Sequence, residues 1–168
     1  MKKLFFALAL AASFGFGYAF NHLAQKSNPE ERGRVTGIGG IFFKCKDPKA
    51  TKEWYSKNLG MNMDAYGTLF EWRLATDSTK TGTSQWGVFK ETTKYFLPST
   101  KEFMINYRVN DLELLIKQLK TDKVTICDTM ETYDYGKFIH IMDPEGNKIE
   151  LWQPLDWKFD RTGRGITK

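Results

Sequence analysis

Hydrophobic and polar positions follow two different periods along this chain, and the order of the two periods repeats once. An apolar run over 38–46 is followed by Asp47 and Pro48, a capping residue and a proline of the kind that begin a helix. Apolar positions with helical spacing then continue over 49–57. Strands are expected over 62–66, 69–75 and 85–89, with a polar loop over 76–84. The pattern predicts one strand, one helix and three more strands.

The same order restarts near residue 103. A strand is predicted over 103–109, and Asp111 caps a helix with apolar residues at Leu112, Leu115, Ile116 and Leu119. Three strands are then predicted over 124–133, 137–142 and 148–152. Asp47 and Asp111 occupy matching places, which sets an offset of 64 residues between two units. A unit of this kind that occurs twice indicates the fold as a whole.

The second unit ends in a strong hairpin signal. The turn cluster Asp-Pro-Glu-Gly-Asn over 143–147 separates two runs of strand character. If the ends of this cluster pair, His140 lies opposite Glu150 on one face of the sheet, with Cβ atoms about 5 Å apart. The pair is interpreted either as a satisfied polar pair that closes the core or as an acid–base pair that anchors a substrate.

Composition agrees with one globular domain and weakens one class of function. The chain has 168 residues, of which 41% are hydrophobic, and this is enough for one packed core. The net charge is +5, but Lys and Arg are scattered along the chain. Binding to nucleic acid needs them clustered on one face, so we expect no nucleic-acid partner.

The first residues resemble an export signal. Lys2 and Lys3 precede an apolar run over 4–20. Residues 1–19 are therefore expected to be a signal peptide or an uncleaved membrane tether, and 20–34 a linker. Either reading places the domain outside the cytoplasm, periplasmic, extracellular or anchored. Export would permit a disulfide, but only the even number of cysteines supports one, so we expect Cys45 and Cys127 to be free thiols.

The doubled unit and the run DPEGNKIELW over 143–152 resemble the vicinal oxygen chelate superfamily, which includes glyoxalase I, extradiol dioxygenases, fosfomycin-resistance enzymes and bleomycin-binding proteins. The resemblance covers roughly residues 35–154. It implies an α+β fold in which two βαβββ modules, 35–98 and 99–154, form a curved, incomplete barrel around a central pocket. A loosely packed tail over 155–168 follows, with Trp157 and Phe159 as candidates for holding part of it against the domain. The resemblance leaves open whether the modules pair within one chain or across a homodimer.

Metal ligands in related proteins come from the first and last strands of each unit. The positions implied here are Gly40, Met104, Glu150 and Trp86, or Gln85 if the register slips by one residue. Glycine has no side chain, and a thioether is a poor ligand for hard or borderline cations. Glu150 is the only ligand of the family type that is retained, so we expect no metal and no other cofactor.

Strand parity extends the site to a set of pocket candidates: Gly40, Phe42, Trp72, Trp86, Met104, Asn106, Phe138 and Trp152. Arg108 lies near a strand end and is expected to be solvated. We therefore expect a protein that binds a small apolar or aromatic molecule without the usual metal site. The alternatives are a lyase- or dioxygenase-type enzyme that uses Glu150 and His140, with or without a weakly held divalent metal, or a scaffold that only keeps the fold.

Overall fold

The computed structural model of the protein describes residues 32–161 and 166–167. The chain divides into two compact units, Met1–Arg32 and Gly33–Lys168, and the description below concerns the second. The signal peptide or tether predicted over 1–19 and most of the linker predicted over 20–34 lie outside the described residues. Across the described part of the chain, no helix is both long enough and apolar enough to cross a membrane.

The first unit contains β1 (Val35–Cys45), α2 (Pro48–Leu59), β2 (Thr68–Leu74) and β3 (Asp77–Lys90). Helix α2 begins as predicted, because the Asp47 side chain accepts hydrogen bonds from the amides of Lys49 and Ala50 at 2.9 and 3.0 Å. It ends at Gly60, which has a φ of 69° and donates its N–H to the Ser56 carbonyl. Local capping chemistry therefore sets both ends of the helix.

The second unit contains β4 (Phe103–Val109), α3 (Leu112–Thr121), β5 (Glu131–Tyr133), β6 (Gly136–Met142) and β7 (Lys148–Pro154). The chain then forms a short 3-10 helix, η2 (Asp156–Arg161), and the two-residue strand β8 (Ile166–Thr167). The Asp111 side chain caps α3 by accepting from the Leu114 amide at 2.8 Å. Leu112 and Ile116 bury the apolar face of α3 against β4, β6 and β7.

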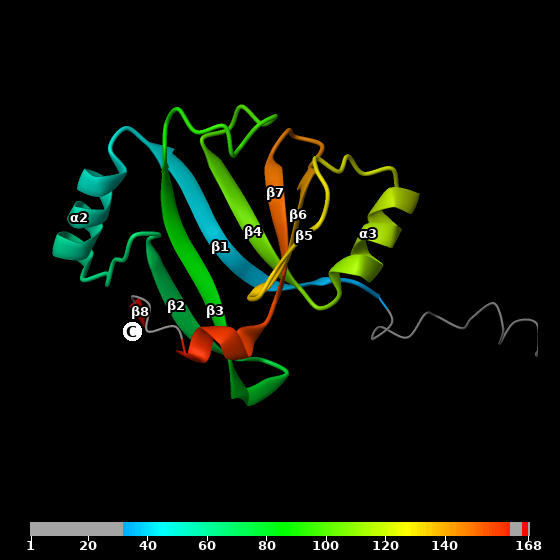
Figure 1. Cartoon of the computed structure of the whole chain (residues 1–168), viewed down its shortest axis with the longest axis horizontal. Coiled ribbons are helices and arrows are strands. Elements are labelled where there is room, and N and C mark those ends of the chain that lie inside the picture. Colours follow the sequence, from blue (N-terminus) through cyan, green and yellow to red (C-terminus); the bar gives the residue numbers. More distant parts are fainter. Residues whose placement is uncertain (1–31, 162–165, 168) are drawn as a thin grey trace, which may run out of the picture. The chain divides into compact units, whose positions relative to one another are not determined.

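The eight strands form one open sheet in the order β5-β6-β7-β4-β1-β3-β2-β8, with α2 and α3 outside its two flanks (Figure 1). Strands β1 and β4 meet antiparallel at the centre, where Gly40 pairs with Asn106 and Phe42 pairs with Met104. Gly40 and Met104 are equivalent positions under the offset of 64 residues, and so are Phe42 and Asn106. The two pairs are therefore equivalent to each other. The repeat read from the sequence is therefore a pseudo-twofold relation, and the α+β fold with a curved, incomplete barrel is confirmed.

The prediction of a strand over 62–66 is wrong. This segment forms a turn, in which the Asp64 amide donates to the Gly67 carbonyl at 2.7 Å. The edge position beside β2 is taken instead by β8, which pairs in parallel with Leu69 and Phe70. The Thr167 hydroxyl lies 2.8 Å from the Thr68 hydroxyl. The first unit thus completes its half of the sheet with a strand from the far end of the chain.

Two other boundaries also differ from expectation. The polar segment over 76–84 is not a loop, because β3 begins at Asp77 and pairs with β2 from Leu74 onward. Threonine is a good strand residue even when both faces are polar, and this stretch contains four. Over 124–133 only Glu131–Tyr133 is a strand, and Ile126 makes a single bridge to Ile141.

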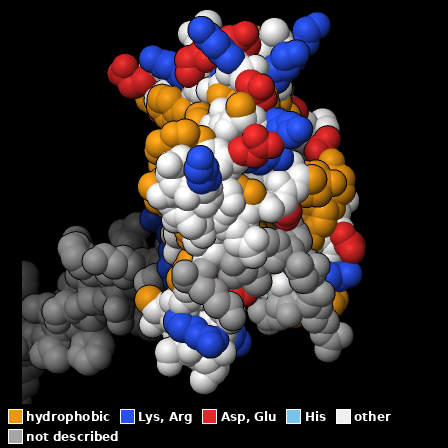
Figure 2. Space-filling model, turned by 90° about the vertical axis from the view of Figure 1, so that its left-hand side faces the viewer, with side chains coloured by type: hydrophobic (Ala, Val, Ile, Leu, Met, Phe, Trp, Pro, Cys, Tyr) orange, Lys and Arg blue, Asp and Glu red, His pale blue; other side chains and the backbone are white. Residues whose placement is uncertain are grey.

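The two flanks of the sheet are packed differently. No residue of α2 is buried, and its contact with the sheet is aromatic: Tyr55 lies 4.6 Å from Trp86 between ring centroids. Trp54 and Leu59 remain 55% and 57% exposed. Figure 2 shows this side of the molecule, where charged side chains of both signs are interspersed with apolar ones.

The thiols of Cys45 and Cys127 are free, as predicted.

Arg108 is buried, not solvated as expected, and it holds the C-terminal segment. Its side chain is 3% exposed and makes two hydrogen bonds to Asp156 of η2, at 2.5 and 2.7 Å. A third bond goes to the Thr83 carbonyl at 3.1 Å. The guanidinium lies between the rings of Trp72 and Trp152, 5.2 and 5.1 Å from their centroids. Charge pairing and cation–π contacts together compensate the burial of this cation.

Part of the segment expected to be a loose tail is therefore packed against the sheet, namely the helix η2. Phe159 of η2 is 8% exposed and lies 5.3 Å from Trp152 between ring centroids, in a cluster with Leu69. Trp157 on the same helix is 57% exposed.

Replacement of these two aromatic residues tests this packing. Phe159→Ala is expected to lower the free energy of unfolding by about 3 kcal/mol, because it leaves a cavity beside Trp152. Trp157→Ala is the matched control and should change it by less than about 0.5 kcal/mol. Urea unfolding of the full chain measures both. Equal losses in the two variants would contradict the docking of η2 through Phe159.

Candidate functional site

A row of residues crosses four neighbouring strands on the inner face of the sheet. Gln85 of β3 pairs with Gly40 of β1, Gly40 pairs with Asn106 of β4, and Asn106 pairs with Glu150 of β7. A bulge in β1 leaves Gly39 as an extra residue beside Gly40. A Cβ atom on Gly39 would lie 2.0 Å from Asn106 Oδ1, so only glycine allows this close approach.

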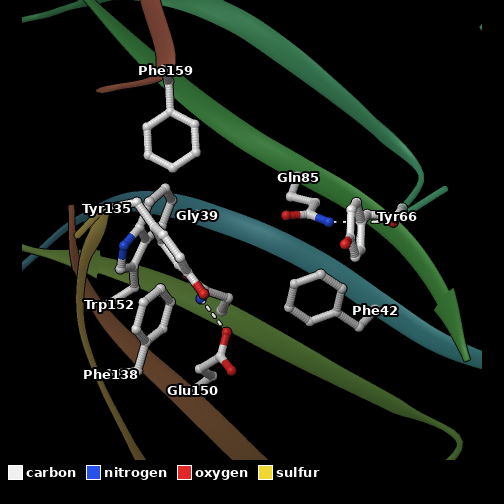
Figure 3. A pocket seen from close by; sticks show the side chains of 10 residues that line it. Gly39, Phe42, Tyr66, Gln85, Tyr135, Phe138, Glu150, Trp152 and Phe159 are labelled. Atoms are coloured by element: carbon white, nitrogen blue, oxygen red, sulfur yellow. Dashed lines mark hydrogen bonds between the residues drawn. The ribbon is translucent and has the colours of Figure 1, made fainter. Parts of the chain in front are cut away.

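A cavity of about 400 Å³ lies over this row (Figure 3). Its wall contains six aromatic side chains, three polar ones and Gly39 of β1. The lining residues are Gly39, Phe42, Tyr66, Gln85, Asn106, Tyr135, Phe138, Glu150, Trp152 and Phe159. A second cavity of about 370 Å³ adjoins the first and shares six of these residues, including Glu150. It adds Tyr95, Glu131 and Tyr133 to the wall.

Glu150 is the most densely bonded polar group of the site. The hairpin pairs it directly with His140, as predicted, and His140 Nε2 lies 3.1 Å from Glu150 Oε1. The Tyr95 hydroxyl donates to the same oxygen, and Asn106 Nδ2 donates to Oε2. Three of the roughly four lone-pair sites of this 4% exposed carboxylate are thus occupied by the protein.

His140 lies between two carboxylates. Its Nδ1 is 2.6 Å from Asp128 Oδ2, and its backbone amide donates to Asp128 Oδ1 at 2.9 Å. An imidazolium donates to both Asp128 and Glu150, whereas a neutral ring donates to one. His140 is 6% exposed and is not on the wall of either cavity. It contacts Glu150 on the side away from the cavity.

Tyr95 comes from the segment between β3 and β4. Its ring stacks on Phe89 at 5.3 Å between centroids, with an interplanar angle of 9°. The buried Lys148 ammonium donates to the Tyr95 carbonyl at 2.7 Å and lies 5.2 Å from the ring centroid. These contacts hold the phenol toward Glu150.

The pKa values of two of these groups are shifted. Burial by itself would raise the pKa of Glu150, but hydrogen bonds from His140, Tyr95 and Asn106 outweigh it and hold the pKa below its ordinary value. Burial and the charge of Glu150 raise the pKa of Tyr95 far above its ordinary value. Glu150 therefore carries its charge at neutral pH, and the Tyr95 hydroxyl keeps its proton.

The structure brings together only part of the predicted pocket. Phe42, Asn106, Phe138, Trp152 and Glu150 line the cavity.

Four predicted pocket residues lie elsewhere. Gly40 adjoins the wall without lining it, and Met104 is fully buried in a core cluster with Phe42 and Phe96. Trp86 is on the opposite face against Tyr55, because a shift of one residue in a strand reverses the face. Trp72 packs beyond the cavity on Arg108.

Sequence reasoning missed several residues of the site. Gly39 joins the wall through a bulge that strand parity does not contain, and Phe159 comes from the segment expected to be loose. Tyr95 and Asp128 reach Glu150 and His140 from irregular segments, and no local pattern marks either of them. The turn cluster that predicted the His140–Glu150 pair carries no information about these long-range partners.

Comparison with known proteins identifies the family. The model of the Glyoxalase/Bleomycin resistance protein/Dioxygenase superfamily matches residues 37–151, which include both units. The chain belongs to this superfamily. No curated protein matches the sequence.

Solved structures agree with this superfamily fold. Methylmalonyl-CoA epimerase from Mycobacterium tuberculosis is 18% identical, with a TM-score of 0.50, over 75% of this chain and 93% of that chain. A variant of Streptomyces coelicolor methylmalonyl-CoA epimerase in complex with 2-nitronate-propionyl-CoA is 17% identical, with a TM-score of 0.54, over 73% and 99%. At these identities the likeness shows the fold alone.

The positions that the resemblance implies for metal ligands offer few ligating side chains in this structure. Gly40 has no side chain, Met104 is in the core, and the Gln85 amide nitrogen donates to the Tyr66 carbonyl at 3.2 Å. Glu150 is bonded through both oxygens. Within the described residues, no group of three or more His, Cys, Asp or Glu side chains is arranged to hold a metal ion.

Replacement of Glu150 tests the network through its dependence on pH. Glu150→Gln is expected to lower the free energy of unfolding by about 3 kcal/mol near neutral pH, because the buried His140 and Asn106 and the half-exposed Tyr95 lose a charged hydrogen-bond partner. A lowered pKa means that the carboxylate stabilises the fold above its ordinary value of 4.5 and loses this effect as the pH falls. The difference in the free energy of unfolding between wild type and Glu150→Gln should therefore become smaller as the pH falls below about 4.5.

The matched control is Glu145→Gln, in the exposed turn of the same hairpin. It should match wild type at each pH. Denaturant unfolding across a pH series measures all three proteins. A Glu150→Gln deficit that stays constant to the acid end of the series would contradict the lowered pKa.

Proposed function

We propose that this protein binds a small apolar or aromatic molecule in the cavity over β1, β4 and β7, without a resident metal. The observation that carries the proposal is the wall itself: six aromatic side chains surround about 400 Å³, with Glu150 at one side. Cavities of this size and lining are typical of small-molecule sites. The fold of the superfamily places such a cavity inside the incomplete barrel.

The bonding of Glu150 supports a role without metal. A cation that bound this carboxylate would have to compete with Tyr95, His140 and Asn106, which already bond to it. Displacing His140 or Asn106 leaves a buried polar group without a partner, at a cost of about 1–3 kcal/mol each. The remaining positions of the row supply an amide and a glycine. The charge of Glu150 therefore serves the protein fold and the wall of the cavity.

Catalysis by the His140–Glu150 pair receives less support. Both ring nitrogens of His140 face carboxylates, and the ring is separated from the cavity by Glu150. The epimerases named above share the fold at 17–18% identity, and a shared fold does not carry a reaction with it. A binding role requires no movement of the network, whereas proton transfer through His140 does.

The proposal includes the place where the domain acts. Lys2 and Lys3 followed by the apolar run over 4–20 support export or tethering, with the binding domain outside the cytoplasm. Association into a homodimer remains a prediction from the resemblance to the superfamily.

Two glycine variants on one strand test the binding function. Wild type is expected to bind the neutral fluorescent dye N-phenylnaphthylamine saturably. Gly39→Ala should weaken binding at least about tenfold, because its Cβ would displace Asn106 and the Trp152 ring and so reshape the wall. Gly37→Ala is the matched control, since its Cβ meets nothing closer than 3.5 Å. Fluorescence titration of the full chain measures the affinities.

Unfolding curves of both variants exclude a general loss of structure. If wild type shows no saturable binding of the dye, or if Gly39→Ala binds it as well as Gly37→Ala does, the proposed function is wrong.

A further inference from the structure

The wall of the cavity contains negative charge and no positive charge. Glu150 lines both cavities, and Glu131 lines the second one. No Lys, Arg or His is among the described residues that line either cavity. The neighbouring basic groups do not line either cavity: His140 lies 3.1 Å from Glu150 on the side away from the wall, Arg108 is paired with Asp156, and Lys148 donates to the Tyr95 carbonyl.

Neither amide of the wall offers its NH₂ group to a ligand. Asn106 donates its Nδ2 to Glu150, and its Oδ1 is buried against Gly39 without a hydrogen-bond partner. Gln85 donates its Nε2 to the Tyr66 carbonyl, and Figure 3 shows its oxygen turned toward the interior of the cavity. Because each NH₂ group is committed to an acceptor, the orientation of both amides is set by their bonds. The Gln85 oxygen therefore adds negative potential to the charge of Glu150.

Aromatic rings surround this negative end. Figure 3 shows Tyr135, Phe138, Trp152 and Phe159 on one side of the cavity and Phe42 and Tyr66 on the other, with Glu150 at the base. Phe138 and Trp152 are stacked at 5.8 Å between centroids, with an interplanar angle of 8°. Trp152 and Phe159 meet edge to face at 5.3 Å. Ring faces attract cations through their quadrupole, and desolvation strengthens the attraction.

The charge on Glu150 persists at neutral pH. Its hydrogen bonds keep the pKa below the ordinary value despite burial. One of its lone-pair sites, on Oε2, remains open beside the cavity wall. The carboxylate therefore supplies a fixed negative field in a poorly solvated place, where charge interactions are stronger than in water.

We infer that the ligand of this cavity is an organic cation, an ammonium group carried on an apolar or aromatic body. The inference deepens the proposed function and rests on it. The ammonium group would lie against the ring faces near Glu150, and the apolar body would fill the rest of the wall. Anions would meet the Glu150 carboxylate and the Gln85 amide oxygen in a wall without cations, so carboxylates and phosphates are disfavoured in the same place.

Three probes that share a benzyl group and differ in charge test the preference for charge. Benzyltrimethylammonium is a cation, neopentylbenzene is its neutral carbon isostere, and phenylacetate is an anion. Each probe is titrated against the full chain, with N-phenylnaphthylamine as the displaced dye. The cation is expected to bind at least about tenfold more tightly than the neutral isostere, and phenylacetate at least about tenfold more weakly than the isostere.

Three variants locate the source of the preference. In Glu150→Gln the ratio of cation to neutral affinity should fall below about threefold, while Glu145→Gln, with the same loss of charge on the hairpin turn, should keep the wild-type ratio. Phe138→Leu keeps an apolar wall but removes a ring face, so its ratio should also fall. This variant keeps the test valid if Glu150→Gln fails to fold.

The outcomes separate the inference from the proposed function. If the dye binds but the neutral or anionic probe matches or exceeds the cation, the inference is wrong and the binding function stands. An unchanged ratio in folded Glu150→Gln or in Phe138→Leu also overturns the inference. If neither the dye nor any probe binds, both the function and the inference fail.

Discussion

The carboxylate of Glu150 is the contact on which the inner face of this domain depends. It joins β7 to β4 through Asn106, to β6 through His140, and to the irregular segment before β4 through Tyr95. Asp128 extends the network behind His140. A buried charge is tolerated only when it is paired and hydrogen-bonded, and here every donor comes from a different part of the chain. The network therefore fixes these segments relative to one another and forms one side of the cavity.

A second buried charge, of opposite sign, closes the other end. Arg108 lies two residues beyond Asn106 on the same face of β4, and its pairing with Asp156 fixes η2. This position lets Phe159 pack on Trp152 and complete the aromatic wall. Successive inward positions of one strand thus carry the donor that serves Glu150 and the cation that holds the C-terminal segment. The cavity between them keeps an anionic wall because the cation is shielded by two tryptophans.

Much of the fold could be predicted from the sequence because its signals are local. Caps at Asp47 and Asp111 and the turn over 143–147 specify where elements begin and how one hairpin pairs, and the structure has them as predicted. The repeat indicated two matching units but left their pairing open, and the structure shows β1 paired with β4 within one chain. The errors arise where long-range contacts decide. The strand beside β2 is supplied by residues about one hundred positions later in the chain. Trp86 lies on the opposite face from the one predicted, because an error of one residue in the register of a strand reverses the face. Tyr95 and Asp128 come from segments without periodicity, so nothing in their neighbourhood predicts a role.

We propose that Glu150 is satisfied by protein donors and lines a binding cavity instead of holding a metal. Anomalous diffraction from crystals of the full chain soaked with Mn²⁺ or Zn²⁺ tests this proposal. We expect no ordered ion at Glu150, with Tyr95, His140 and Asn106 still bonded to the carboxylate. An ion coordinated by Glu150, with those hydrogen bonds broken, would contradict it.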